Sequence, residues 1–257
     1  MKKTNENIIY FKTFEDDVVI SKNQNYKIKE NYKWIHTHPI YKITSCIMYK
    51  IASIFGYFYC KINLKIQIEN KKVLKNYKKQ GYFLYANHTQ PVGDVFIPNE
   101  ICRPKRTYIV VSQANLGIPV VGKLLPMLGA LPISSSINNT KKLYDAINKR
   151  INEGNCVVIY PEAHVWPYYT KIREFSNTSF KFPVELDKPS FCVTTTYYKK
   201  SKKPGIRIFI DGPFFPDKNL TKKDRSKKLH DDIYYTMKKR AENSNYEYIK
   251  YRKEEKE

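Results

Sequence analysis

A histidine and an aspartate flank the five residues 89–93 in the stretch YANHTQPVGD. On one helix, at about 100° per residue, Asp94 would point about 120° away from His88, so the two can meet only through a loop. Pro91 and Gly93 favour such a loop. A neutral imidazole with a carboxylate on its other nitrogen can take a proton from a hydroxyl. The alternative is that His88 satisfies a turn and Asp94 caps the next helix.

The elements around this pair follow an alternating pattern. From residue 63 onward, short β-type runs alternate with helical patterns, which predicts an α/β protein with a mixed sheet flanked by helices. A second apolar run, 156–160, ends in Pro161 and Glu162, and sites of α/β proteins gather at such strand ends. The charged tail YIKYRKEEKE is expected to fray. The expected strands lie at 64–69, 82–87, 106–112, 156–162, 190–198 and 206–211, and the expected helices at 139–153 and 221–241.

The most apolar window in the first third of the chain is 43–62, ITSCIMYKIASIFGYFYCKI. Lys50, Ser53 and Gly56 interrupt it, so its longest apolar stretch is shorter than the roughly 20 residues that a membrane span requires. Two interpretations remain. The window is either a helix buried in the core or an interfacial helix whose aromatic face enters a bilayer while Lys50 and Lys61 reach the headgroups.

The net charge of +22 attracts anionic partners, of which nucleic acid and the anionic face of a membrane are the obvious candidates. Abundant Lys, Asn, Ile and Tyr also fit an AT-rich coding sequence, so part of the excess can reflect codon bias on a solvated surface. Five widely spaced cysteines indicate reduced thiols in a cytosolic chain. No apolar region follows the basic start of the sequence, so we expect no signal peptide.

Other chemistries find less support in the sequence. It has no GxSxG elbow, no glycine-rich phosphate loop and no CxxC pair. His36 and His38 have no further ligand cluster nearby, so we expect no metal. Interleaved Tyr and Lys residues suit single-stranded nucleic acid, but no standard signature accompanies them, and we expect no nucleic-acid partner.

Taken together, the pieces resemble the PlsC family of glycerolipid acyltransferases, the 1-acylglycerol-3-phosphate acyltransferases and their relatives. The resemblance runs from about residue 64 to about residue 215. YANHTQPVGD is similar to the family's Asn-His…Asp motif, GALPI at 129–133 to its second motif, NCVVIYPEA at 155–163 to its Pro-Glu-Gly motif, and 179–193 to the stretch entering its fourth. This implies a glycerolipid acyltransferase-like fold, with a catalytic domain at 63–257 and an N-terminal extension at 1–62.

The resemblance also implies a reaction. An acyl group would pass from an activated donor to a hydroxyl of a lysophospholipid or glycerol phosphate, without a covalent enzyme intermediate. His88 would be the base, Asp94 its orienting partner, and Glu162 would help to position the acceptor. No cofactor is implied, because acyl-CoA, an acyl carrier protein or acyl phosphate would serve as co-substrate.

The implied partners are lipid substrates, an anionic membrane surface and potentially an acyl carrier protein. Family members often associate with membranes through apolar helices ahead of the catalytic domain, which favours the interfacial interpretation of 43–62. The expected location is peripheral, on the cytoplasmic face of a membrane, and the expected process is phospholipid biosynthesis.

Departures from the family's pattern concern the loop and the acceptor. Five residues separate His88 from Asp94 where the family usually has four. Serines at 134–136 stand where the family carries a phosphate-binding arginine, and Ala163-His164-Val165 replaces its Gly-Thr-Arg. A glycerol-phosphate acceptor is therefore less secure than acyl transfer itself.

Basic residues farther along could hold a phosphate instead, since a guanidinium or an ammonium suits that anion. The candidates are Lys171, Arg173 and Lys181, each of which could equally be an ordinary surface charge. His164 is either a second site histidine or a loop residue that fills space. Two other functions stay open: a non-catalytic lipid-binding protein on the same fold, and a basic nucleic-acid-binding protein.

Overall fold

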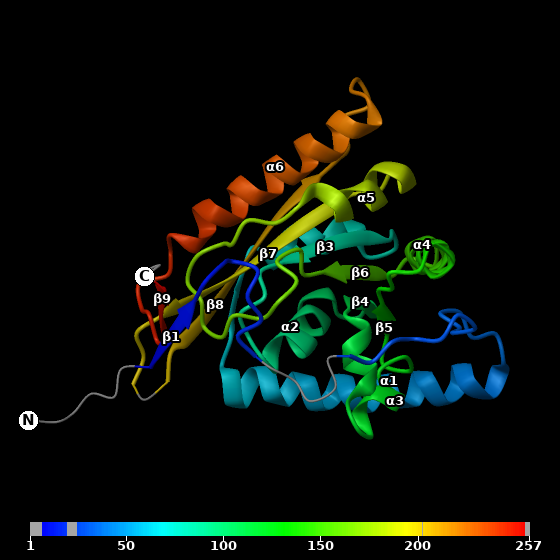
Figure 1. The fold of residues 1–257 in the computed structure, drawn as a ribbon, viewed down its shortest axis with the longest axis horizontal. Coiled ribbons are helices and arrows are strands. Elements are labelled where there is room, and N and C mark those ends of the chain that lie inside the picture. Colours follow the sequence, from blue (N-terminus) through cyan, green and yellow to red (C-terminus); the bar gives the residue numbers. More distant parts are fainter. Residues whose placement is uncertain (1–6, 20–24, 202, 255–257) are drawn as a thin grey trace, which may run out of the picture.

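Seven strands form one mixed sheet at the centre of the molecule (Figure 1). The computed structural model describes residues 7–19, 25–201 and 203–254. The strand order is β2-β8-β7-β3-β6-β4-β5, and all neighbours are parallel except β7 and β8. The predicted α/β fold with a mixed sheet is thereby confirmed. The strands are β2 (Gln67–Glu69), β3 (Tyr82–Ala86), β4 (Thr107–Val111), β5 (Ala130–Pro132), β6 (Cys156–Ile159), β7 (Ser190–Tyr198) and β8 (Gly205–Phe214).

The central strand β3 sets the position of the loop that carries the histidine. All five of its residues are buried, as expected for a parallel strand covered on both faces. In the register, Tyr85 lies opposite Ile159 of β6 and Cys192 of β7. Because parallel strands end at the same edge of a sheet, the segments that follow β3 and β6 emerge side by side.

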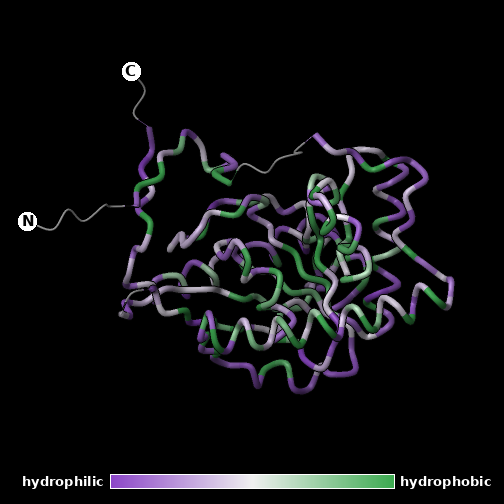
Figure 2. The backbone as a smooth tube through the Cα atoms, turned by 90° about the horizontal axis from the view of Figure 1, so that it is seen from below, coloured by the Kyte–Doolittle hydropathy of each residue, from purple (hydrophilic) through white to green (hydrophobic). Residues whose placement is uncertain are grey.

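Helices cover both faces of the sheet, and the alternation of strand side chains divides the core in two. Phe83 and Tyr85 belong to the first cluster, whereas Tyr82 and Leu84 belong to the second. The first cluster includes residues of α4 (Ile137–Asn152), α5 (Lys181–Leu186) and α6 (Lys222–Ala241), and the second includes residues of α2 (Gly93–Cys102). Seen from below, hydrophobic stretches gather towards the middle and hydrophilic stretches follow the rim (Figure 2). The shorter helical segments are Lys71–Tyr77, Gln113–Gly117, α3 (Val121–Leu124) and Asn177–Phe180.

The apolar window at 43–62 forms helix α1 (Pro39–Phe58), which continues as a π-helical turn over Tyr59–Leu64. By length and composition alone, this helix could cross a membrane. Only 17% of its most apolar window is buried inside the protein, which is too little for a helix of the core. One side is attached to the domain, since the Tyr49 hydroxyl donates to Asn99 Oδ1 at 2.8 Å. Figure 1 shows α1 lying along the lower side of the molecule. The buried-core interpretation is therefore wrong, and interfacial placement stays a prediction.

The two ends of the chain meet in a second, two-stranded sheet. Strand β1 (Ile8–Phe11) pairs in parallel with β9 (Lys250–Lys253). Trp166 packs against both strands, with ring centroids 4.8 Å from Phe11 and 4.9 Å from Tyr251. The prediction that the tail frays is wrong for β9, because β1 supplies backbone partners and Trp166 an apolar contact. The division of the chain at residue 62 stays a prediction.

Candidate active site

The loop 89–93 brings His88 and Asp94 together. His88 Nδ1 lies 2.7 Å from Asp94 Oδ2, so the contact predicted through a loop is present. The Gln90 N–H also donates to Asp94 Oδ2, at 3.0 Å, and the Asp94 N–H donates to the Gln90 carbonyl, at 3.0 Å. The five-residue loop therefore closes against the first turn of α2, which begins at Gly93.

The imidazole is held on one side and open on another. Its ring stacks on Tyr160, with centroids 4.4 Å apart, and the His88 side chain is 23% exposed while that of Asp94 is 5% exposed. Because Nδ1 faces the carboxylate, Nε2 is the nitrogen available to a substrate. Burial raises the pKa of the Asp94 carboxyl above its usual value, and the hydrogen bond from His88 opposes that rise.

Glu162 lies beside this pair, as the two adjacent strand ends predict. Its Oε2 accepts the His88 backbone N–H at 3.1 Å, and its Oε1 accepts the Arg173 N–H at 3.0 Å. Burial raises the pKa of the Glu162 carboxyl, while the Arg173 charge acts in the opposite direction. The Glu162 side chain thus ties the histidine loop to the segment after β6.

Arg173 completes the attachment from the same segment. Its guanidinium is 1% exposed, lies 3.4 Å from Glu162 Oε2, and donates to the Phe14 carbonyl at 3.0 Å and to the His164 carbonyl. It also lies 4.8 Å from the ring of Trp166. The sequence offered Arg173 either as a phosphate-binding candidate or as an ordinary surface charge, whereas these contacts bury its guanidinium against Glu162.

The side chains of the other basic candidates are exposed or contact other residues. Lys171 and Lys181 are exposed, and Lys181 Nζ lies 5.6 Å from the centre of the Phe182 ring. His164 is 41% exposed, with Nδ1 3.5 Å from Asp17 Oδ2. Neither of these two contacts involves His88 or Asp94.

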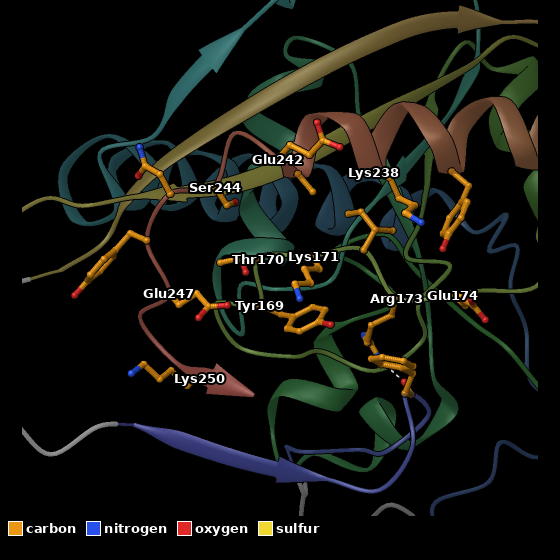
Figure 3. A pocket seen from close by; sticks show the side chains of 16 residues that line it. Tyr169, Thr170, Lys171, Arg173, Glu174, Lys238, Glu242, Ser244, Glu247 and Lys250 are labelled. Atoms are coloured by element: carbon orange, nitrogen blue, oxygen red, sulfur yellow. Dashed lines mark hydrogen bonds between the residues drawn. The ribbon is translucent and has the colours of Figure 1, made fainter. Parts of the chain in front are cut away.

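Lys171 lines a pocket of about 920 Å³ between the segment after β6 and the residues from the end of α6 to β9 (Figure 3). Its charged lining is mixed, with both ammonium and carboxylate groups around the cavity. The charged residues are Lys171, Arg173, Glu174, Lys238, Glu242, Glu247 and Lys250. His88 and Asp94 are not among the described residues that line it, so this pocket is not the one around the imidazole.

Two residues that hold the loop were not identified from the sequence. The buried Tyr197 hydroxyl lies 2.8 Å from Thr89 Oγ1 and accepts from Gln90 Nε2 at 2.9 Å. Asn87 bridges to β7, donating to the Thr195 carbonyl at 3.0 Å and accepting the Thr195 N–H at 2.8 Å. Nothing in the sequence distinguishes Tyr197 from the other tyrosines of a chain with 22.

Within the described ranges, no group of three or more His, Cys, Asp or Glu residues could hold an ion. The arrangement offers a buried carboxylate, an imidazole and a partly open ring nitrogen, which is the equipment for abstracting a proton from a hydroxyl.

Comparisons with known proteins agree with this fold. A family model described as Acyltransferase matches residues 65–196, which is just over half of the chain. A solved structure of the 1-acyl-sn-glycerophosphate (LPA) acyltransferase PlsC from Thermotoga maritima is similar, with a TM-score of 0.53, 14% identity, and coverage of 77% of this chain and 80% of that one. No curated protein sequence matches. On the extent of the family match, the chain belongs to the acyltransferase family.

Proposed function

We propose that this protein transfers a fatty acyl group from an activated donor to a hydroxyl of a lysophospholipid or a glycerol-phosphate-like acceptor. The observation that carries the proposal is the 2.7 Å contact between His88 Nδ1 and Asp94 Oδ2, at a strand end and with the ring partly exposed. An oriented imidazole of this kind is a general base for hydroxyl attack on an activated carbonyl.

The reaction follows from that geometry. The acceptor hydroxyl gives its proton to His88 Nε2 while its oxygen forms a bond to the acyl carbonyl carbon. The tetrahedral intermediate then collapses, the bond to the thiolate or phosphate of the donor breaks, and the proton on Nε2 can pass to the leaving group. Asp94 keeps the proton on Nδ1 and stabilises the imidazolium between these steps.

Glu162 and Arg173 act in this proposal as positioning residues. Glu162 accepts the His88 N–H, and Arg173 holds Glu162 while sharing the segment after β6. The exposed Lys171, Lys181 and His164 are the remaining candidates to contact an acceptor's phosphate, by charge alone.

The exposed face of α1 supports a peripheral membrane location, which would suit lipid substrates. Large apolar side chains recur at intervals of three and four residues along the outer face of α1, which puts them on one stripe. They are Ile40, Ile43, Ile47, Ile51, Ile54 and Phe58, all more than half exposed, and Ile62 continues them. Such a stripe suits the boundary between headgroups and acyl chains, and the charge of +22 favours an anionic, cytoplasmic leaflet.

The test is acyl transfer by the purified protein, followed by lipid mass spectrometry. Donors would be acyl-CoA, acyl carrier protein and acyl phosphate, and acceptors a panel of lysophospholipids, glycerol phosphate and alcohols without phosphate. We expect His88→Ala and Asp94→Ala to lose about 10²–10⁴-fold in rate while remaining folded. Exposed His38→Ala and Asp145→Ala are the matched controls.

No product with any donor and acceptor would instead favour a non-catalytic lipid-binding protein. Salt-sensitive binding of nucleic acid without acyl transfer would favour the nucleic-acid alternative. Equal activity of His88→Ala and His38→Ala would exclude the proposed base.

A further inference from the structure

A second pocket, of about 230 Å³, lies between the N-terminal half of α1 and the edge of the sheet at β4 and β5. We call it the α1–β4 pocket. At about 30 Å³ per water, it has room for a phosphate-sized anion together with water. Among the residues that line it are Tyr32, Tyr41, Lys42, Arg106, Tyr108 and Arg150.

The lining of the α1–β4 pocket is strongly basic. Lys42, Arg106, Lys149 and Arg150 supply four positive charges, and Glu153 is the carboxylate among its lining residues. Glu153 pairs with Lys149 and with Arg150, each at 2.9 Å. Arg106 instead donates to neutral oxygens, the Ser45 hydroxyl at 2.8 Å and the Met127 carbonyl at 2.6 Å. A net positive charge therefore remains within the lining.

Among the residues that the structure describes, four buried polar atoms of this lining find no hydrogen-bond partner. They are Arg106 Nε, Arg150 Nε and the hydroxyl oxygens of Tyr32 and Tyr41. Buried polar groups are almost always paired, so four unpaired ones around a single cavity need an explanation. Each can donate a hydrogen bond, and an anion with several acceptor oxygens is the kind of partner that such donors lack.

The side chains of this pocket are held in place before any ligand arrives. The guanidinium groups of Arg106 and Arg150 lie 5.1 and 4.7 Å from the centre of the Tyr108 ring. His36 stacks on Tyr41 with ring centroids 3.8 Å apart. Burial lowers the pKa of His36, and the Arg150 charge lowers it further, as expected where the local potential is positive.

The α1–β4 pocket is separate from the His88 site. Arg106 directly precedes β4, and its carbonyl accepts the Cys156 N–H at the start of β6. His88 follows the other, carboxyl end of β3, which runs parallel to β6. The two sites therefore lie at opposite ends of the parallel strands, the pocket at their amino ends and His88 at their carboxyl ends. On α1, at about 100° per residue, Tyr41, Lys42 and Ser45 face the sheet, on the side of the helix away from the apolar stripe.

We propose that the α1–β4 pocket binds a phosphate group, as a site distinct from the acyl-transfer centre. Two sources can present this group: the headgroup of a phospholipid, or a soluble phosphate ester. Phosphate matches the arrangement because its oxygens accept from guanidinium and hydroxyl donors together.

The test measures binding of two kinds of probe to the full chain. Soluble probes are inorganic phosphate and glycerol 3-phosphate, titrated calorimetrically. Membrane probes are vesicles of phosphatidylcholine with and without phosphatidylglycerol, in a sedimentation assay. We expect Arg150→Gln to weaken phosphate binding about tenfold, because a charged hydrogen-bond donor is lost.

A second variant tests phosphate binding without changing the charge of the pocket. Tyr32→Phe with Tyr41→Phe removes only the two unpaired hydroxyls, so we expect a stable protein whose phosphate binding is weaker by about fivefold or more. Exposed Lys227→Gln and Tyr235→Phe on α6 are the matched controls. His88→Ala should bind phosphate normally, which separates this proposal from the acyl-transfer reaction.

The outcomes divide clearly. Weaker binding of the soluble probes in the pocket variants alone supports the site and identifies a soluble ester as sufficient. A reduced preference for phosphatidylglycerol vesicles in the same variants, without soluble binding, supports a lipid headgroup. Equal losses in Lys227→Gln and Arg150→Gln, or no change in the pocket variants with either probe, would overturn the proposal.

Discussion

His88 and Asp94 show how burial and orientation set the properties of a single pair. The carboxylate is buried, which raises its pKa, while the imidazole and the Gln90 N–H stabilise its ionised form. The same imidazole is partly exposed and can meet a substrate. The loop therefore places the charge inside and the exchangeable proton at the surface.

The titration of Asp94 gives a first prediction. Its carboxyl pKa in the folded protein is raised above 3.8, so its contribution to the free energy of unfolding is greatest below 3.8 and falls as the pH rises through the folded pKa. His88→Ala removes an interaction that lowers this pKa. We therefore expect the decline to extend to higher pH in His88→Ala than in the parent protein.

Denaturant unfolding at a series of pH values would measure this effect, with and without Asp94→Asn in each background. The difference that Asp94→Asn makes isolates the contribution of the one carboxyl. Identical pH dependence in the two backgrounds would mean that the imidazole does not stabilise the ionised carboxylate.

At the scale of elements, the loop depends on its attachment to β7. Tyr197→Phe removes a hydroxyl that contacts Thr89 Oγ1 and Gln90 Nε2, and leaves these buried groups with one partner fewer. We expect the free energy of unfolding to fall by about 1–3 kcal/mol and acyl transfer to slow. The control is Tyr198→Phe, which removes a hydroxyl from the next residue while the ring at position 198 stays packed over Gly205. A Tyr197→Phe protein with full stability and activity would contradict this role.

The Glu162–Arg173 pair gives a prediction about the segment after β6. Both side chains are almost fully buried, so removing either one leaves the other charge unpaired. We expect Glu162→Gln and Arg173→Met each to cost about 3–5 kcal/mol of unfolding free energy. The double variant should cost clearly less than the sum, because no lone charge remains. Urea unfolding of the four proteins completes the cycle, and strictly additive costs would show that the two groups do not interact.

Elements with a strong local signal were predictable from the sequence. Strands β3 and β6 are continuous apolar runs, and β7 is rich in β-branched and aromatic residues. Helix 139–153 shows the repeat of Leu143, Ile147 and Ile151 that its buried face requires. Strands β1 and β9 were missed because each depends on a partner from the distant end of the chain. Pairing between distant segments leaves little trace in local periodicity.

The site was also predictable only where its residues follow strands with a strong local signal. His88 and Glu162 follow the ends of neighbouring parallel strands, so their proximity follows from parallel pairing. Asp94, in the first turn of α2, reaches His88 through the loop. The contacts of Arg173 could not be foreseen, because the chain folds back 11 residues to bring its N–H and guanidinium to Glu162. A charge that looks free in the sequence is buried in the structure by that return.

At the scale of the whole molecule, the positive charge and the exposed apolar surface should both favour binding to a membrane. The net charge of +22 should draw the protein to anionic vesicles, and the attraction should weaken as salt shortens the range of electrostatic forces. The apolar stripe of α1 should then hold the protein at the surface in a way that salt does not reverse. The two contributions are separable because only one is screened.

Substitutions in the stripe test this division. Ile47 and Ile54 are 53% and 58% exposed, so Ile47→Glu with Ile54→Glu should leave the fold intact. Each isoleucine that enters the bilayer contributes about 1.5–3 kcal/mol, so the double variant should bind vesicles at least about a hundredfold more weakly at high salt. Ile137→Glu, at an 87% exposed position outside α1, is the matched control in vesicle sedimentation. If it lost as much binding as the stripe variant, or if the stripe variant bound normally, α1 would not be the membrane-binding surface.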